Sequence, residues 1–161
     1  MREFSKVSPK VWRNKQFRAL PTNDAQLVFL YFLTCDHQNS AGSYCVPDGY
    51  AAADLNWTIT RYVEARNLVV QAGLIVFDED TDELFISGWF SKNPSMNPKH
   101  ARSIEAAIAK IDSGVVREAA EEGFQRSEEL KEARASKSGG GNVLEMMDRL
   151  ASSNYMTRGR S

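Results

Sequence analysis

The 161-residue sequence has few of the side chains that most often carry out catalysis, with only two histidines and two cysteines. A structural zinc site needs four ligands at regular spacings. Cys35, His37 and Cys45 have no evident fourth ligand. The sequence also has no recognisable Ser-His-Asp set, no phosphate-binding glycine loop and no paired catalytic carboxylates. We therefore predict that the protein is not an enzyme and holds no metal or other cofactor.

Long apolar runs are absent as well. No run approaches the roughly 18 residues of a membrane-spanning helix, and the N-terminus has no apolar signal-peptide region. Two cysteines fit a reducing compartment, with free thiols favoured over a disulfide between Cys35 and Cys45. These features predict a cytoplasmic protein without membrane partners. The hydrophobic content of 42% and charged content of 25% are those of a globular domain.

A strong charge of either sign is also lacking, since the formal net charge is −1. The local charge is nevertheless uneven. Residues 1–20 hold six cations against one carboxylate, a local charge of +5, whereas residues 21–57 hold four carboxylates and 74–90 hold five, both without a cation. Contacts with DNA are therefore expected from the N-terminal segment, a later helix or the 92–110 stretch.

The hydrophobic pattern predicts a mainly α-helical fold with one small β-hairpin, an α+β class. The predicted order begins with a helix from Ser8-Pro9 to about Gln16, a buried helix at 23–36 and a strand at 43–46. The two motif helices follow, the first at 48–55 and the second capped by Thr58, with a turn at Asn56-Trp57 between them. Strands at 74–77 and 84–87 then flank an acidic turn. The helix after Thr58 has an apolar face of Ile59, Tyr62, Ala65, Val69 and Ala72 and stops at Gly73. This order predicts a winged helix-turn-helix.

Composition changes after this motif and predicts the domain organisation. A winged helix-turn-helix domain is expected over 1–90, and a helical extension over 91–135, with a helix that starts at Asn97-Pro98. A flexible linker is expected over 136–141 because of its consecutive glycines. A short amphipathic helix and a disordered tail are expected over 142–161, with Leu144, Met147 and Leu150 on one side of the helix.

An ordered series of residues across 3–112 resembles a known family. The series consists of Trp12 through Arg18 to Leu20, Leu30-Tyr-Phe-Leu-Thr34 with His37 and Asn39, Gly42, Tyr44 and Tyr50, Ala53-Asp-Leu-Asn-Trp57, Gly73-Leu-Ile, the Phe77-Asp-Glu turn, and Trp89-Phe-Ser-Lys-Asn-Pro94 with Asn97-Pro98. It resembles the N-terminal winged-helix domain of phage and prophage replication proteins and, distantly, DnaD-type replication initiators. The resemblance implies a winged helix that recognises DNA within a replication module.

Three groups of side chains are candidates for DNA contact, with a solvated surface as the alternative for each. The N-terminal group is Lys6, Lys10, Arg13, Lys15 and Arg18, whose aromatic neighbours Trp12 and Phe17 are expected in the core. The second motif helix offers Thr58, Thr60, Arg61 and Asn67, since such side chains can read base edges. A weaker basic set contains Lys92, Lys99, Arg102 and Lys110, of which Lys99 and Arg102 are the candidates to test.

Two further groups are candidates for binding a protein partner. The first is the acidic turn of Asp78, Glu79, Asp80, Asp82 and Glu83, which would repel DNA and lacks the glycine and spacing of a calcium loop. The alternative is a hairpin tip kept soluble by its charge. The second is the stripe of Leu144, Met147 and Leu150, which would dock in a groove, fold back on its own domain or pack in a dimer.

The sequence thus predicts a DNA-binding winged-helix protein of a phage or prophage replication module, acting on duplex DNA. One alternative is a protein-binding winged helix that acts as an adaptor, loader or antagonist of a host protein. Apolar Val63, Leu68 and Val70 on the second motif helix favour this alternative. Another is a dimeric transcriptional regulator on a palindromic site, which a strictly monomeric protein would contradict.

Overall fold

The computed structural model describes residues 4–153, with side chains described for residues 4–137. The structure is α+β, with mostly helical elements and one three-stranded antiparallel sheet. The chain divides into two compact units, Met1–Gln125 and Arg126–Ser161. Within residues 4–153 no helix is both long and apolar enough to cross a bilayer.

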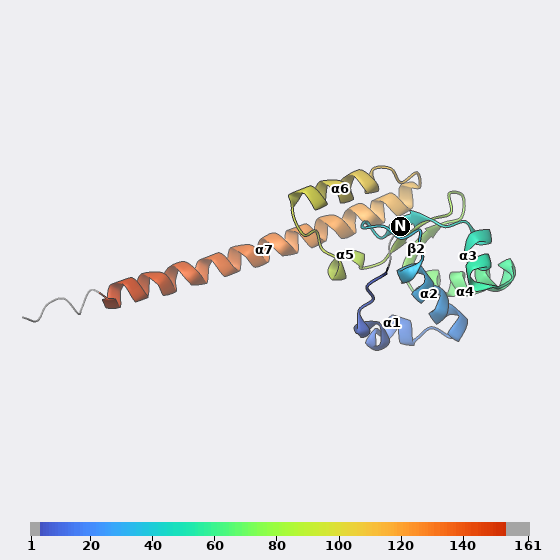
Figure 1. Ribbon diagram of the computed structural model, residues 1–161, viewed down its shortest axis with the longest axis horizontal. Coiled ribbons are helices and arrows are strands. Elements are labelled where there is room, and N and C mark those ends of the chain that lie inside the picture. The colour runs from blue at the N-terminus through green and yellow to red at the C-terminus, as the bar shows by residue number, and fades with distance from the viewer. Residues whose placement is uncertain (1–3, 154–161) are drawn as a thin grey trace, which may run out of the picture. The chain divides into compact units, whose positions relative to one another are not determined.

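The elements follow the predicted order closely (Figure 1). They are the 3₁₀-helix η1 (Pro9–Arg13), α1 (Lys15–Arg18), α2 (Asn23–Thr34), β1 (Ser43–Cys45), α3 (Asp48–Leu55), α4 (Ile59–Gln71), β2 (Ile75–Asp78), β3 (Glu83–Ile86), α5 (Trp89–Lys92), α6 (Pro98–Ile108) and α7 (Gly114–Ser153). The predicted helices at 23–36 and 48–55 and the three predicted strands are confirmed. The single helix predicted for 8–16 is two short helices separated at Asn14, and α5 was not predicted.

Helix ends form where the local sequence predicts them. The Thr58 hydroxyl accepts a hydrogen bond from the Arg61 N–H (3.3 Å), and the Asn97 side chain accepts one from the His100 N–H (2.8 Å). Gly73 follows α4 with a φ of +69°, a left-handed conformation that glycine adopts without steric cost. The two side-chain caps each join residues three positions apart, so the sequence alone identifies them.

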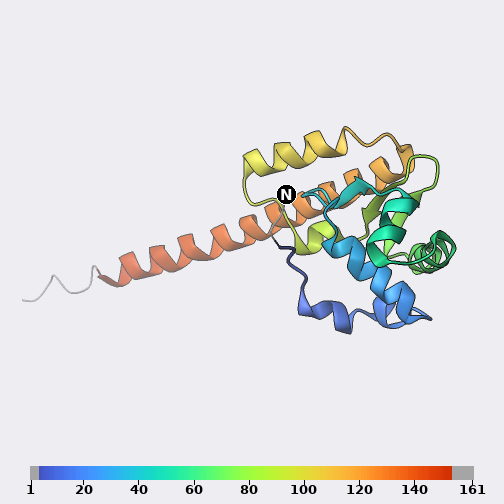
Figure 2. The ribbon, with the colours of Figure 1, turned by 45° about the vertical axis from the view of Figure 1, so that its right-hand side comes forward.

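The sheet has the strand order β1-β3-β2, with β3 in the centre. Leu84 pairs with Tyr44 of β1 and with Phe77 of β2. Leu84, Phe85 and Ile86 of β3 are all buried, so both faces of the sheet are covered, because successive side chains of a strand point to opposite faces. Helices α2, α3 and α4 lie on one side of the sheet, and α6 with the first turns of α7 lies on the other (Figure 2).

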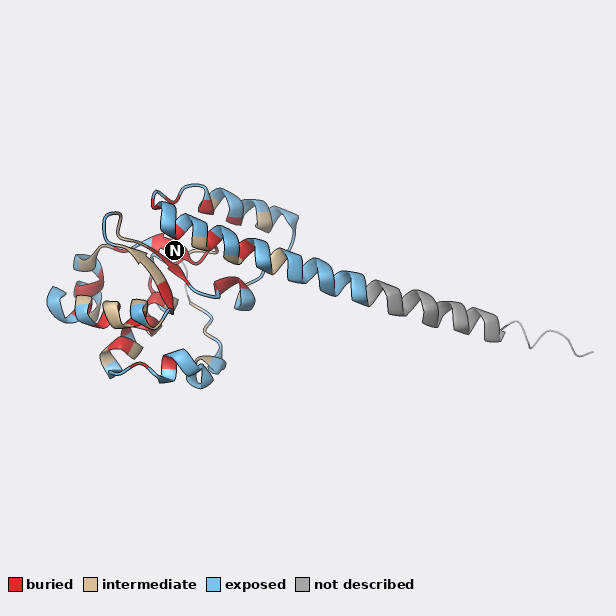
Figure 3. Cartoon of the chain, turned by 180° about the vertical axis from the view of Figure 1, so that it is seen from behind, coloured by how far each residue is buried: buried red, intermediate tan, exposed pale blue. Residues whose placement is uncertain are grey.

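The compact unit extends beyond the predicted boundary at residue 90 to Gln125. Ile104 and Ile108 of α6, and Val116 and Phe124 of α7, are buried in the same core as the sheet (Figure 3). The Phe124 ring contacts the Phe90 ring at a centroid distance of 5.2 Å. The predicted extension is therefore part of the fold, because the second face of the sheet needs apolar cover.

Helix α7 also runs through residues 136–141, where we expected a flexible linker. Strong helix formers such as Glu, Ala, Lys and Arg precede this segment, although each glycine in a helix costs about 1 kcal/mol relative to alanine. All described side chains from Glu129 to Lys137 are exposed. The side chains of Leu144, Met147 and Leu150, and the tail predicted to be disordered, lie outside the described residues.

One prediction about the inward face of α4 is wrong at its first residue. Tyr62, Ala65 and Val69 are buried, as expected, but Ile59 is 56% exposed. Arg66 is buried instead, at 2% exposure, and completes the i, i+3, i+4, i+7 face with the other three. Periodicity shows which side chains share a face, whereas the extent of the core along the helix depends on the neighbouring elements.

Candidate nucleic-acid interface

The N-terminal basic segment, residues 6–18, has a defined conformation. The Ser8 hydroxyl caps η1, and the Asn14 side chain accepts hydrogen bonds from the N–H groups of Gln16 (2.8 Å) and Phe17 (3.2 Å). The Gln16 side chain donates to the Ala72 carbonyl at the end of α4 (3.2 Å). The segment is thus attached beside the C-terminal end of α4, while the Phe17 ring is buried at 1% exposure.

Five cations of the basic segment are exposed to solvent, and they are Lys6, Lys10, Arg13, Lys15 and Arg18. The structure pairs none of them with a carboxylate of residues 4–137. Cations that lack internal carboxylate partners are available for an external polyanion. All five predicted cations are therefore accessible to an external ligand.

The prediction that Trp12 belongs to the core is wrong. Its side chain is 61% exposed, whereas Phe17, five residues later, is buried. The two rings meet edge to face, with centroids 5.5 Å apart and an interplanar angle of 78°. The break between η1 and α1 separates the two aromatics, and a sequence pattern that assumes one continuous helix does not reveal it.

Arg61 at the start of α4 is bound to Asp24 of α2. Its Nε and Nη2 atoms donate to the two carboxylate oxygens at 2.6 and 2.8 Å, and its guanidinium lies 4.1 Å above the centre of the Trp57 ring. The hydrogen bond from Arg61 lowers the pKa of Asp24 and raises that of Arg61. The Arg61 side chain remains 51% exposed. The best base-reading candidate thus already binds a carboxylate.

The other α4 candidates differ in availability. Thr60 is exposed on the first turn of the helix, and Thr58 uses its hydroxyl as the helix cap. Asn67 is half-buried and accepts a hydrogen bond from the Arg66 guanidinium at 3.2 Å. The apolar character of Val63, Leu68 and Val70 suggested a protein contact. All three are half-buried and pack against the core.

Arg66 is a buried partner of the acidic hairpin that sequence reasoning missed. Its guanidinium donates to Asp48 of α3 at 2.7 Å and to Glu79 of the hairpin turn at 3.1 Å, and it lies 4.1 Å above the centre of the Phe77 ring. The only sequence signal was an arginine beside the apolar positions of α4. This contact ties the hairpin to the two motif helices.

Two more hairpin carboxylates have structural roles. The Glu83 side chain accepts hydrogen bonds from the Asp112 N–H (3.1 Å) and the Ser113 N–H (2.7 Å), just before α7 begins. Asp78 accepts one from the Asp80 N–H (3.0 Å), and its pKa is lowered, chiefly by a hydrogen bond from Ser113. The hairpin acids are therefore partly used inside the fold rather than reserved for a partner.

Lys99 and Arg102 are both exposed on α6. Figure 1 and Figure 2 show α6 and α1 on opposite sides of the first unit, so the two basic sets do not form one surface. His100 between them accepts a hydrogen bond from the Met96 N–H at 3.1 Å. The N-terminal cations share one short segment of the chain, and the α6 cations lie on the other side of the unit.

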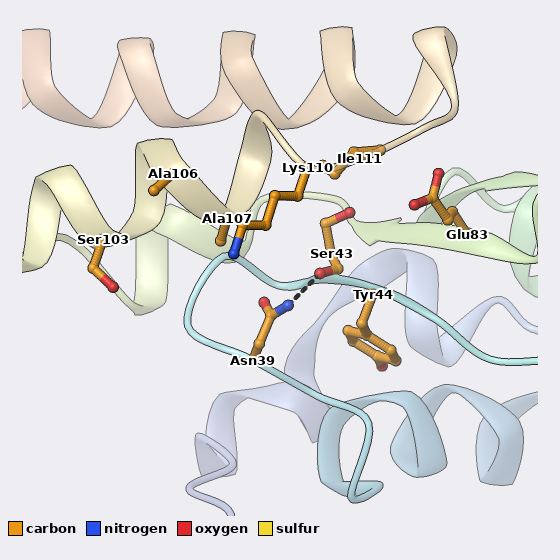
Figure 4. Close-up of a pocket in the computed structure, with 9 residues that line it drawn as sticks. All are labelled: Asn39, Ser43, Tyr44, Glu83, Ser103, Ala106, Ala107, Lys110 and Ile111. Carbon is orange, nitrogen blue, oxygen red and sulfur yellow. Dashed lines mark hydrogen bonds between the residues drawn. The ribbon is translucent and has the colours of Figure 1, made fainter.

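A polar pocket of about 400 Å³ lies between β1 and the C-terminal half of α6 (Figure 4). The Ser43 hydroxyl in its wall is buried without a hydrogen-bond partner. The charged lining residues are Lys110 and Glu83, and the Glu83 carboxylate is already bound to backbone N–H groups. Opposite charges in the lining make it a poor site for a polyanion.

Cys35 is buried and Cys45 is exposed, and both are free cysteines. Within the described residues no group of three or more His, Cys, Asp or Glu side chains is arranged to hold a metal ion.

Comparison of the chain with protein-family models, with curated proteins and with solved structures found no significant match.

Proposed function

We propose that the protein is a DNA-binding winged-helix protein that acts in a phage or prophage replication module. The topology supports the winged-helix assignment, because α2, β1, α3, α4, β2 and β3 follow one another and β1 pairs with β3 in the order β1-β3-β2. In a winged helix the first strand closes the sheet beside the C-terminal hairpin in this manner. The resemblance of residues 3–112 to phage replication proteins supports the replication role.

The observation that carries the DNA-binding proposal is the set of five exposed cations in the basic segment, which lack carboxylate partners among residues 4–137. These cations would contact the phosphates and hold the protein on the duplex. The acidic hairpin would stay outside the groove, because its carboxylates would repel the DNA phosphates. Contacts with phosphates would therefore contribute most of the binding free energy without regard to sequence. Sequence selectivity would come from the start of α4, near Thr60 and Arg61.

Replacing Lys10, Lys15 and Arg18 together with glutamine is expected to weaken duplex binding and reduce its salt dependence. Five phosphate contacts predict a slope of about −4.5 for log affinity against log salt concentration, at about 0.9 per contact. The triple variant should lose about 2.7 of this slope. Fluorescence anisotropy with a labelled duplex across a salt series measures both quantities.

The matched control replaces the three cations Lys92, Lys99 and Arg102, which lie on α5 and α6, with glutamine. It removes the same number of charges outside the basic segment, two of them from α6 on the other side of the unit, so its slope should stay close to that of the wild type. Equal slopes for the wild type and the N-terminal variant would contradict the proposed contact. Absence of duplex binding by the wild type at about 50 mM salt, where electrostatic binding is strongest, would contradict the function itself.

Asp24→Asn is expected to tighten duplex binding by about threefold to tenfold at low salt, which is the typical net contribution of one additional hydrogen bond. The substitution removes the carboxylate that occupies the Nε–Nη2 edge of the Arg61 guanidinium. A freed guanidinium can then donate to a phosphate or to guanine. Asp36→Asn, at an exposed carboxylate outside this pair, makes the same charge change and is the control. The gain should vanish in the double variant Asp24→Asn, Arg61→Gln, and its persistence there would contradict the assigned role of Arg61.

A protein-binding winged helix is the second candidate function. Ile59 at 56% exposure and Tyr50 at 64% exposure are apolar or aromatic side chains on the two motif helices, where a DNA-reading surface is normally polar. An adaptor, loader or antagonist of a host protein would use this surface. Stoichiometric recovery of a host protein by the wild type, with loss of recovery for Ile59→Asp and no duplex binding at low salt, would favour this function.

A further inference from the structure

Trp12 is an exposed, preorganised aromatic surface within the basic segment. The other tryptophans are less available, since Trp89 is 7% exposed and Trp57 is half-buried beneath Arg61. Trp12 is 61% exposed, and its ring is held by the edge-to-face contact with buried Phe17. Its backbone is held in η1, whose first residue is Pro9. The indole therefore loses little conformational freedom when a ligand binds to it.

The cations around Trp12 select the chemistry of the ligand. Lys10 and Arg13 lie two residues before and one residue after it, and Lys15 follows at the start of α1. All three are exposed. A ligand that matches this surface carries regularly spaced negative charges and flat aromatic faces together. Duplex DNA presents its phosphates but hides the base faces in the stack, whereas a single strand presents both.

We propose that the basic segment binds single-stranded nucleic acid, with one base stacked on the Trp12 indole and the adjacent phosphates held by Lys10, Arg13 and Lys15. This inference rests on the proposed nucleic-acid binding by the same segment and adds the preferred strand state. Stacking on an aromatic side chain is sequence-tolerant because every base has a π-face. The segment should therefore favour unpaired over paired strands of the same length.

The test measures binding of the full chain to a labelled 15-nucleotide oligo-dT and to a duplex of equal length by fluorescence anisotropy. Trp12→Ala is expected to weaken oligo-dT binding by about fivefold to 150-fold, the range that corresponds to removing one stacked base. Duplex affinity should change less than twofold. Trp12→Phe should keep most of the oligo-dT affinity because it keeps an aromatic face.

Tyr50→Ala is the matched control, since Tyr50 is equally exposed at 64% but lies on α3 outside the basic segment. Its oligo-dT affinity should equal that of the wild type. Unfolding midpoints should show that each variant remains folded, because both side chains are exposed. Quenching of tryptophan fluorescence by oligo-dT, reduced in Trp12→Phe, gives a second readout.

The possible outcomes separate the two proposals. Unchanged oligo-dT affinity in Trp12→Ala, or equal losses for oligo-dT and duplex, would overturn the stacking proposal without contradicting the proposal that the protein binds duplex DNA. Failure of the wild type to bind either ligand at about 50 mM salt would overturn both proposals. A selective loss for oligo-dT with rescue by Trp12→Phe supports the single-strand assignment.

Discussion

Replacing Arg66 with alanine is expected to lower the free energy of unfolding by about 3 kcal/mol, because removal of one partner from a buried ion pair leaves the other unpaired. Arg66 is 2% exposed and binds Asp48, whose side chain is 29% exposed. Its second partner, Glu79, is 74% exposed and returns to water at little cost. The loss therefore comes mainly from Asp48 and from the missing contact with the Phe77 ring. Urea denaturation followed by circular dichroism measures it.

Arg61→Ala is the matched control for this prediction. Both arginines lie on α4, both bind an aspartate and both stack over an aromatic ring at 4.1 Å. They differ in burial, and exposed ion pairs contribute little to stability. Arg61→Ala should therefore shift the denaturation midpoint only slightly. Arg66→Met restores packing without charge and should recover part of the loss. Equal midpoints for the two alanine variants would contradict the structural role of Arg66.

Gly42→Ala is expected to destabilise the fold by about 3–4 kcal/mol, the sum of a left-handed backbone cost and an overpacking cost. Gly42 has a φ of +65°, and an added Cβ would lie 2.3 Å from Cγ of Trp89. The indole cannot easily move away, because it is 7% exposed and its Nε1 donates to the Ser40 carbonyl at 2.9 Å. The loop before β1 would therefore have to shift. This shift would weaken the hydrogen bond that the Gly42 carbonyl accepts from the Ile86 N–H at 2.9 Å.

Gly49→Ala provides the comparison for this variant. Gly49 lies in α3, and apart from its chain neighbours and the local helix backbone nothing lies within 4 Å of an added Cβ. Alanine is favoured over glycine in a helix by up to about 1 kcal/mol. The two substitutions should therefore shift the thermal midpoint in opposite directions. A Gly42→Ala protein as stable as the wild type would mean that the Trp89 side chain can relax.

The hydrogen bonds made by the hairpin carboxylates change the interpretation of the acidic hairpin. Sequence reasoning treated its five carboxylates as one negative surface that repels DNA and is available to a partner. In the structure Glu79 binds Arg66, Glu83 binds backbone N–H groups before α7, and Asp78 orders the turn. The acidic residues thus connect the hairpin to α4 and α7, which accounts for much of their presence without an external ligand.

Much of the fold was predictable because its signals are local. The Thr58 and Asn97 caps, the Gly73 stop and the hairpin each depend on residues close together in the chain. The missed boundary near residue 90 has a different origin. Ile104, Ile108 and Phe124 are apolar positions of helices that looked like a separate extension, and only the uncovered face of the sheet determines where they pack.

The sequence by itself determined the order of helices and strands from α2 to β3, the caps at Thr58 and Asn97, and the concentration of cations near the N-terminus. Each of these follows from residue type and short-range spacing. The tertiary structure alone decided that Arg61 binds Asp24 across 37 residues, that Arg66 is buried against Asp48 across 18, and that Trp12 lies outside the core. The physical reason is that an ion pair forms, or a ring is buried, only where two elements pack against each other. Which elements pack together depends on residues far apart in the chain.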